Sequence, residues 1–100
     1  MYYSFHPLLG EESKNSSLKV LYHPEKKESV ILNASAATFY SICERQDEPT
    51  VSDEKLCRQY LDRYRASGIS EERLLRDVYT ILRTFVGYGI LEETGEQRDG

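Results

Sequence analysis

Hydrophobic and polar residues follow two different periods along this chain, and the change of period divides it into two halves. Short runs rich in β-branched and aromatic residues cover 18–22 and 28–32, with a polar turn from His23 to Lys27 between them. Such runs predict two antiparallel strands joined as a hairpin. After Asn33 the apolar positions recur every three or four residues, which is the period of amphipathic helices. The pattern therefore predicts strands first and helices afterwards.

The first residues predict a third strand. Residues 2–9 are apolar and aromatic but include Pro7, and residues 10–17 form a polar loop. Proline has no backbone N–H, so a strand around Pro7 must be short or lie at a sheet edge. Together with the hairpin, this strand gives a three-stranded antiparallel sheet, which must pack on the helices to be stable.

Two helices follow the hairpin. The first is predicted from about Ala34 to Arg45, with Asn33 as its N-cap and small residues in its first turn. The second follows Ser52, which caps a start rich in carboxylates, and extends to about residue 66. Gly68 is the expected C-terminal cap of this second helix.

The third helix is predicted from Ser70, its N-cap, to about Tyr88, and Gly89 ends it. Its apolar residues spread over about 160° of the helix circumference, whereas a helix that faces only a core needs roughly 100°. The strands or a binding partner must cover the apolar surface of this helix that the core leaves exposed. Residues 94–100 are polar and predict a flexible tail after a single domain of residues 1–93.

Charge and composition narrow the classes of function. The chain has 100 residues and a net charge of −4. An acidic balance argues against a free-standing nucleic-acid binder, which needs an excess of Lys and Arg. No apolar stretch is long enough to span a membrane, and residues 1–13 do not resemble a signal peptide, so we expect a cytoplasmic protein with no membrane partner.

Candidate catalytic and metal-binding residues are sparse. His6 and His23 have no Cys, His or acidic residue at metal-ligand spacing, so we expect no metal and no cofactor. Cys43 and Cys57 lie on apolar helix faces without a base nearby in sequence, which favours reduced core thiols over nucleophiles. The carboxylates gather at helix starts, where capping explains them. We therefore expect a protein that is not an enzyme.

The charged residues of the third helix allow several interpretations. Three arginines, Arg73, Arg76 and Arg83, lie within about 80° of one another around the helix axis. They form either a solvated face or an anchor for an acidic partner. The most specific acidic partner would be DNA, with the helix in its groove. However, Glu71, Glu72 and Asp77 cancel the positive charge of the three arginines, so the helix has no net charge for phosphate contacts. Asp77 itself, at the border of the apolar stripe, is either simply solvated or an acceptor for a bound chain.

One strand of a three-stranded sheet must have a free edge, and that edge can template a further strand. If the strand Glu28–Leu32 lies beside the third helix, its edge and the surplus apolar width of that helix form a trough. Such a trough takes an extended peptide by β-augmentation, in which main-chain hydrogen bonds give affinity and pockets select side chains.

Four features in this order resemble the PqqD-like family, also called the RiPP precursor recognition element. They are Val30-Ile31-Leu32-Asn33, the small residues 34–37, Asp77-Val78 and Gly89-Ile90-Leu91. The resemblance covers about residues 18–92. It implies an α+β, winged-helix-like domain with an N-terminal three-stranded antiparallel sheet followed by three helices, in which a precursor's leader peptide adds to the third strand against the third helix.

The resemblance also implies a set of binding residues and partners. On the strand side the groove would be lined by Ser29, Val30, Ile31 and Leu32, and on the helix side by Leu74, Asp77, Ile81, Thr84, Arg73 and Tyr88. The chain would be a non-catalytic adaptor that presents the leader to a protease, a cyclase or a radical SAM enzyme. Free-standing relatives of this kind are the lasso-peptide B-protein type and PqqD itself.

Two other functions stay open at this point. The rival class is a winged-helix DNA-binding regulator, which should show a basic face and a strong salt dependence of binding. A third possibility is a structural subunit that binds its enzyme but no peptide.

Overall fold

The computed structural model describes residues 1–11 and 19–95 of the chain. In order, its elements are β1 (Tyr2–Phe5), β2 (Leu9–Glu11), β3 (Lys19–His23), β4 (Glu28–Leu32), α1 (Ala34–Glu44), β5 (Val51–Ser52), α2 (Asp53–Arg63), α3 (Glu71–Tyr88) and β6 (Leu91–Gly95). One antiparallel sheet has the order β2-β3-β4 and a second has the order β5-β1-β6. The predicted α+β fold, with an N-terminal three-stranded antiparallel sheet and three helices, is confirmed, and winged-helix describes it only loosely.

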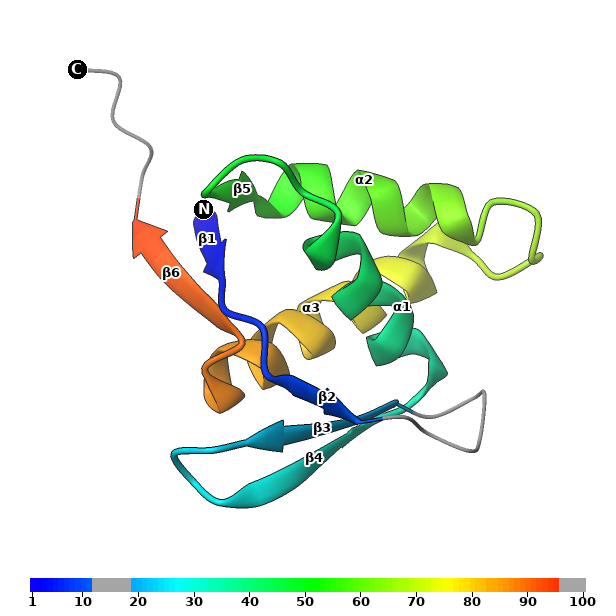
Figure 1. Cartoon of the computed structure of the whole chain (residues 1–100). Coiled ribbons are helices and arrows are strands. Elements are labelled where there is room, and N and C mark those ends of the chain that lie inside the picture. The colour runs from blue at the N-terminus through cyan, green and yellow to red at the C-terminus, as the bar shows by residue number, and fades with distance from the viewer. Residues whose placement is uncertain (12–18, 96–100) are drawn as a thin grey trace.

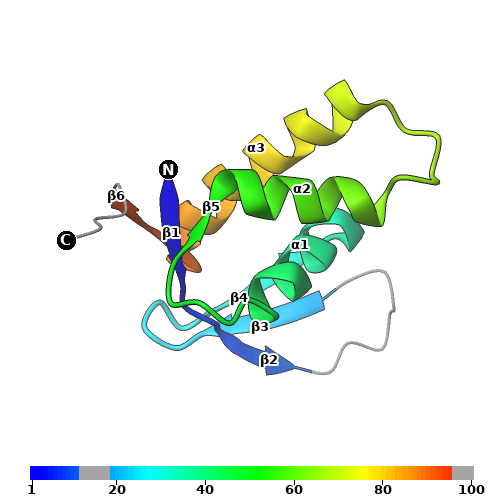
Figure 2. The ribbon, with the colours of Figure 1, turned by 90° about the horizontal axis from the view of Figure 1, so that it is seen from above.

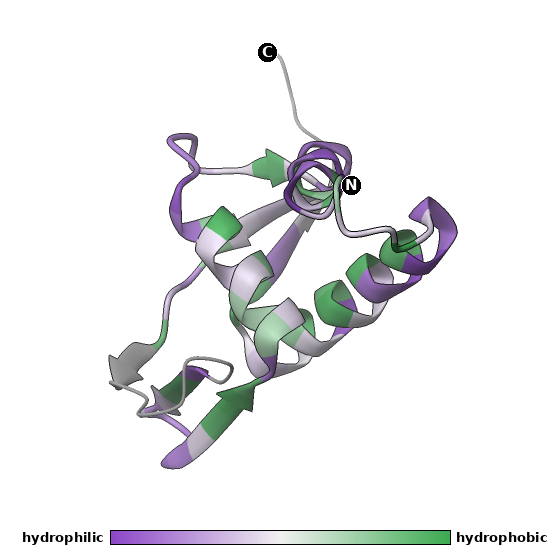
Figure 3. Cartoon of the chain, turned by 90° about the vertical axis from the view of Figure 1, so that its right-hand side faces the viewer, coloured by the Kyte–Doolittle hydropathy of each residue, from purple (hydrophilic) through white to green (hydrophobic). Residues whose placement is uncertain are grey.

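The main sheet and one helix form opposite sides of the molecule. The sheet β2-β3-β4 lies along one side, α2 lies along the opposite side, and α1 and α3 run between them (Figures 1 and 2). The small sheet β5-β1-β6 gathers three segments from distant parts of the chain near the N-terminus. Hydrophobic and hydrophilic residues alternate along α3, which therefore has one face to bury, whereas α1 consists mostly of small and apolar residues (Figure 3).

The first strand of the main sheet differs from the prediction. Gly10 and Glu11, assigned to a polar loop, belong to β2, whereas Tyr2–Phe5 pairs with β5 and β6 in the second sheet. Pro7 lies between β1 and β2 and cannot donate to a ladder, so one continuous strand is split into two. The rest of the predicted loop, residues 12–17, and Leu18 lie outside the described residues.

Two boundaries also differ. Helix α2 ends at Arg63, several residues before Gly68, because the Ser67 hydroxyl donates to the Tyr64 carbonyl at 2.7 Å and accepts from the Ile69 N–H at 3.2 Å. Local bonds of this kind compete with a further helical turn. At the other end, the first two residues of the predicted tail, 94 and 95, belong to β6, which the pairing with β1 prolongs.

The three predicted N-caps and the C-cap Gly89 are confirmed, whereas Gly68 does not cap α2, whose C-cap is Tyr64. Asn33, Ser52 and Ser70 each accept a hydrogen bond from the backbone N–H three residues later, at 2.9, 3.1 and 3.2 Å. Each bond satisfies one of the N–H groups that a helix start leaves free. Gly89 closes α3 with φ +79°, a conformation that residues with a side chain adopt only with strain.

An aromatic cluster from all three helices forms the centre of the core. Phe39 makes edge-to-face contacts with Tyr60 and with Phe85, at centroid distances of 5.9 and 5.7 Å, and Tyr40 meets Phe85 at 6.2 Å. All four side chains are buried. The Tyr40 hydroxyl also accepts a hydrogen bond from the Leu8 N–H at 3.1 Å, which attaches the segment between β1 and β2 to α1.

The two cysteines are free thiols in different surroundings. Cys43 on α1 is buried, and this burial, with a smaller contribution from the Glu44 charge, raises its pKa to about 12. Cys57 on α2 is half-buried, and burial followed by the Asp53 and Glu71 charges raises its pKa as well. Because the thiolate is the nucleophile, both thiols are poor nucleophiles near neutral pH.

Replacing Phe85 by alanine tests the importance of the aromatic cluster. Phe85→Ala removes a fully buried ring that contacts two other aromatic side chains, so we expect a loss of about 3–5 kcal/mol in the free energy of unfolding, measured by urea denaturation. The matched control is Val86→Ala on the same helix, which should cost less than about 1 kcal/mol because Val86 is 38% exposed. Equal losses for the two variants would contradict this account of the core.

Alkylation separates the two thiols. Since a raised pKa lowers the fraction of thiolate at any given pH, and since Cys43 is also inaccessible, iodoacetamide at pH 8.5 should modify Cys57 first, as read by peptide mass spectrometry. In concentrated urea both thiols should react at similar rates. Modification of Cys43 before Cys57 in the folded protein would show that the burial is wrong.

Candidate functional site

Strand β4 forms an open edge of the main sheet. It pairs with β3 from Lys19↔Leu32 to His23↔Glu28, and on its other side no strand of the described chain pairs with it. An edge strand of this kind presents unpaired N–H and C=O groups. The expectation that the strand Glu28–Leu32 has a free edge is therefore confirmed.

A groove of about 270 Å³ lies between this strand and α3. We call it the β4–α3 groove. From the end of β4 and the start of α1 it is lined by Ile31, Leu32, Asn33, Ser35 and Ala36. From α3 it is lined by Asp77, Thr80, Ile81, Thr84, Phe85 and Tyr88, whose spacing of three or four residues places them on one face of the helix.

Helix α3 and strand β4 run in opposite directions along the groove. At the C-terminal end of α3, the Gly87 carbonyl accepts a hydrogen bond from Lys26 Nζ at 3.5 Å, and Lys26 lies in the turn before β4. Asp77 precedes Gly87 by 10 residues on α3, about 15 Å, and Ser35 comes just after the end of β4; both line the groove. Asp77 is therefore at the end of the groove where β4 passes into α1, and Tyr88 is at the end where β4 begins.

The groove brings together most of the residues singled out from the sequence. Six of them line it: Ile31, Leu32, Asp77, Ile81, Thr84 and Tyr88. The other four lie elsewhere. Val30 is buried in the core, Ser29 is exposed on β4, Leu74 is buried nearer the N-terminal end of α3, and Arg73 is exposed beside it.

Sequence reasoning missed five lining residues, Asn33, Ser35, Ala36, Thr80 and Phe85. The first three were interpreted only as a helix cap and a small-residue helix start. Their part in the groove follows from the immediate passage of β4 into α1, which places a helix start at the mouth. Thr80 could have been found, because it lies one turn before Thr84 on the same face.

Most polar groups in the groove are already bonded within the chain. The Thr80 hydroxyl donates to the Arg76 carbonyl at 3.1 Å, and the Thr84 hydroxyl donates to the Thr80 carbonyl at 2.9 Å. Asp77 differs from them. It is half-buried and is the only charged residue lining the groove, and its carboxylate makes no hydrogen bond or ion pair with any residue in the described part of the chain.

A buried tyrosine lies behind this end of the groove. Burial raises the pKa of Tyr60 to about 12, and the Tyr64 and Asp77 charges add to the rise, whereas a hydrogen bond from the Ser35 side chain opposes it. The Tyr64 hydroxyl in turn donates to Thr38 at 3.4 Å.

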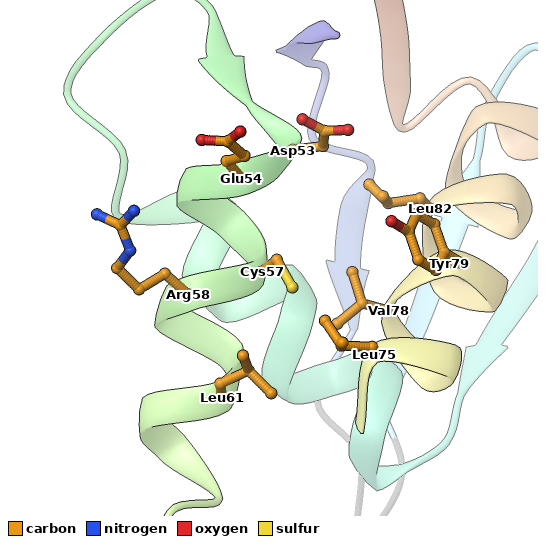
Figure 4. A pocket seen from close by; sticks show the side chains of 9 residues that line it. All are labelled: Asp53, Glu54, Cys57, Arg58, Leu61, Leu75, Val78, Tyr79 and Leu82. Atoms are coloured by element: carbon orange, nitrogen blue, oxygen red, sulfur yellow. The ribbon is translucent and has the colours of Figure 1, made fainter. Parts of the chain in front are cut away.

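A second cavity of about 340 Å³ lies between α2 and α3. Cys57 and Leu61 of α2 face Leu75, Val78, Tyr79 and Leu82 of α3, with charged residues at the rim (Figure 4). Tyr79 is 64% exposed, and Val86 further along α3 is 38% exposed. The sequence predicted that the strands or a partner would cover the surplus apolar surface of α3, which would form a trough with β4. Ile81, Phe85 and Tyr88 do line the β4–α3 groove, whereas the exposed Tyr79 lies on the α2 side of the helix.

The described part of the chain contains neither a cluster of metal-binding side chains nor a membrane-spanning helix. Within residues 1–11 and 19–95, no three His, Cys, Asp or Glu side chains come close enough together to hold a metal ion. None of the helices in those residues is long and apolar enough to cross a membrane.

A solved structure described as "TbiB1 in Complex with the TbiA(beta) Leader Peptide" has a similar fold. The superposition has a TM-score of 0.67 and covers 93% of this chain and 98% of that one, at 16% sequence identity. At this identity the likeness shows a shared fold. A comparison with curated proteins found no match.

The family comparison is more direct. The model of a family described as "Coenzyme PQQ synthesis protein D (PqqD)" matches residues 19–91. The match begins with β3 and ends in β6, so it contains β4, all three helices and every residue of the β4–α3 groove. It also confirms the family resemblance seen in the sequence. This chain belongs to the PqqD family.

Proposed function

We propose that this protein is a non-catalytic adaptor that binds the leader of a ribosomally synthesised and post-translationally modified peptide precursor. The leader adds as a strand to the open edge of β4, and the protein presents it to a processing enzyme. The observation that carries this proposal is the free edge of β4 beside a groove that α3 closes on its other side. An edge with an adjacent groove supplies the two elements of β-augmentation, backbone partners and side-chain pockets.

Two comparisons support the proposal. The chain belongs to the PqqD family, and the similar TbiB1 structure is described as a complex with a leader peptide. As processing partners we propose a radical SAM enzyme, a protease or a cyclase, with the lasso-peptide type slightly favoured. The expected place of action is the cytoplasm, where precursors of this kind are made.

The proposed site divides between backbone and side-chain contacts. Residues 29–32 would offer their backbone along the edge, including Ser29 and Val30, whose side chains do not line the groove. Asp77, Ile81, Thr84 and Tyr88 would contact the leader's side chains. Arg73 and Leu74 lie one turn before Asp77, so they would be reached only by a leader that continues past that end of the groove.

No finding favours the alternative of a DNA-binding regulator. Arg76 on α3 pairs with Glu72 at 3.6 Å, and the whole chain has a net charge of −4. Phosphate contacts give most of the affinity of DNA-binding proteins, and this chain can offer few. The structural-subunit alternative makes a different prediction, namely that no peptide binds at the β4 edge.

Filling the groove should weaken leader binding strongly. Thr84→Trp places an indole in the groove, so we expect the affinity for a fluorescently labelled leader, from a precursor encoded near the gene for this chain, to fall more than about tenfold in an anisotropy titration. The matched control is Val86→Trp, which adds the same indole on the other side of α3 and should leave the affinity within about twofold. Equal losses would place the leader outside the groove.

Hydrogen exchange tests the mode of binding. Adding the leader should slow amide exchange in β4, because a new strand pairs with its edge, and should leave β2 at the opposite edge of the sheet unchanged. Leader binding without protection of β4 would contradict strand addition. Failure of every neighbouring leader to bind would contradict the adaptor function and favour a structural subunit.

A further inference from the structure

We propose that the β4–α3 groove selects leaders with a lysine or arginine that faces Asp77, followed at alternate positions by apolar side chains that point toward Tyr88. This inference rests on the proposed function and adds the class of leader that the site accepts. It assigns to Asp77 the role of a specificity-determining residue.

The first observation is the state of the Asp77 carboxylate. It is half-buried at one end of the groove, and no cation of the described chain pairs with it. A leader strand that covers the groove would remove water from this carboxylate. Burying an unpaired charge is costly, whereas a cation on the leader offsets the loss of water. The groove therefore discriminates between leaders by the charge that they place at this end.

The second observation is the hydrogen-bonding capacity that the groove leaves free. The hydroxyl protons of Thr80 and Thr84 are bonded to carbonyls of their own helix, so these oxygens can act toward a ligand only as acceptors. The carboxylate of Asp77 is also an acceptor. Ammonium and guanidinium groups have donors and no acceptors, so they match these three side chains of α3 better than a carboxylate does, although the Asn33 amide and the Tyr88 hydroxyl offer donors elsewhere in the groove.

The third observation is the length and direction of the groove. Tyr88 follows Asp77 by 11 residues on α3, which corresponds to about 16 Å. Inward-facing residues on an added strand repeat about every 6.8 Å, so three of them fit beside this stretch. Antiparallel pairing with β4, the more stable arrangement per residue, would run the leader in the same direction as α3. The basic residue therefore comes first, and apolar residues follow two and four positions later.

A selection experiment tests this proposal without a known leader. A phage library of random 12-residue peptides is selected on the full chain and on Asp77→Asn, Asp77→Lys and the matched control Glu72→Lys. Glu72 is an exposed carboxylate on the same helix outside the groove, and thermal unfolding checks that each variant is folded. Peptides that lose binding to Thr84→Trp are counted as occupants of the groove.

We expect groove-binding peptides to be enriched in lysine or arginine at one position, with apolar residues two and four positions later. The basic preference should disappear with Asp77→Asn, change to Asp or Glu with Asp77→Lys, and persist with Glu72→Lys. For a single selected peptide, replacing the basic residue by glutamine should weaken binding to the wild-type chain about fivefold and binding to Asp77→Asn hardly at all.

The failures are distinguishable. Groove-binding peptides with no basic preference, or with a preference that survives Asp77→Asn, would overturn this inference and leave the adaptor function intact. A library with no peptide that depends on Thr84 would overturn strand addition itself, and the role of Asp77 with it.

Discussion

The unpaired edge of β4 is the feature on which the rest of the site depends. A free row of backbone donors and acceptors invites aggregation unless its surroundings restrict which chains can reach it. Here β4 passes into α1 through Asn33 alone, so the helix start lies at one end of the edge, and α3 lies along its side. The edge therefore faces a groove of defined length rather than open solvent.

Helix α3 has a polar flank and an apolar flank on either side of its buried stripe. Its buried stripe, which includes Phe85, packs into the aromatic cluster and fixes the helix relative to α1 and α2. One flank presents Asp77, Thr80 and Thr84 to the groove, and the opposite flank presents the exposed Tyr79 to the α2 side. The groove is thus the more polar of the two surfaces, which suits a site that must discriminate between peptides of similar backbone.

The parts of the candidate site that depend on short-range sequence patterns could be predicted. The strand Glu28–Leu32, the cap Asn33 and the face of α3 that carries Asp77, Ile81 and Thr84 all follow from short-range patterns. The family resemblance supplied the pairing of this strand with α3. The same reasoning could not divide the apolar surface of α3 between the groove, where Ile81 and Phe85 lie, and the α2 side, where Tyr79 is exposed, because periodicity shows how wide an apolar stripe is but not which neighbour covers each of its edges.

The sequence by itself determined the three helices, their N-caps and the hairpin, since each depends on interactions between residues only a few positions apart. Only the tertiary structure decided that β1 leaves the main sheet to pair with β5 and β6, because this pairing joins the two ends of the chain and no local pattern encodes it. It also decided that Asp77 has no partner in the described chain. Whether a carboxylate is paired depends on which distant side chains the fold brings within reach.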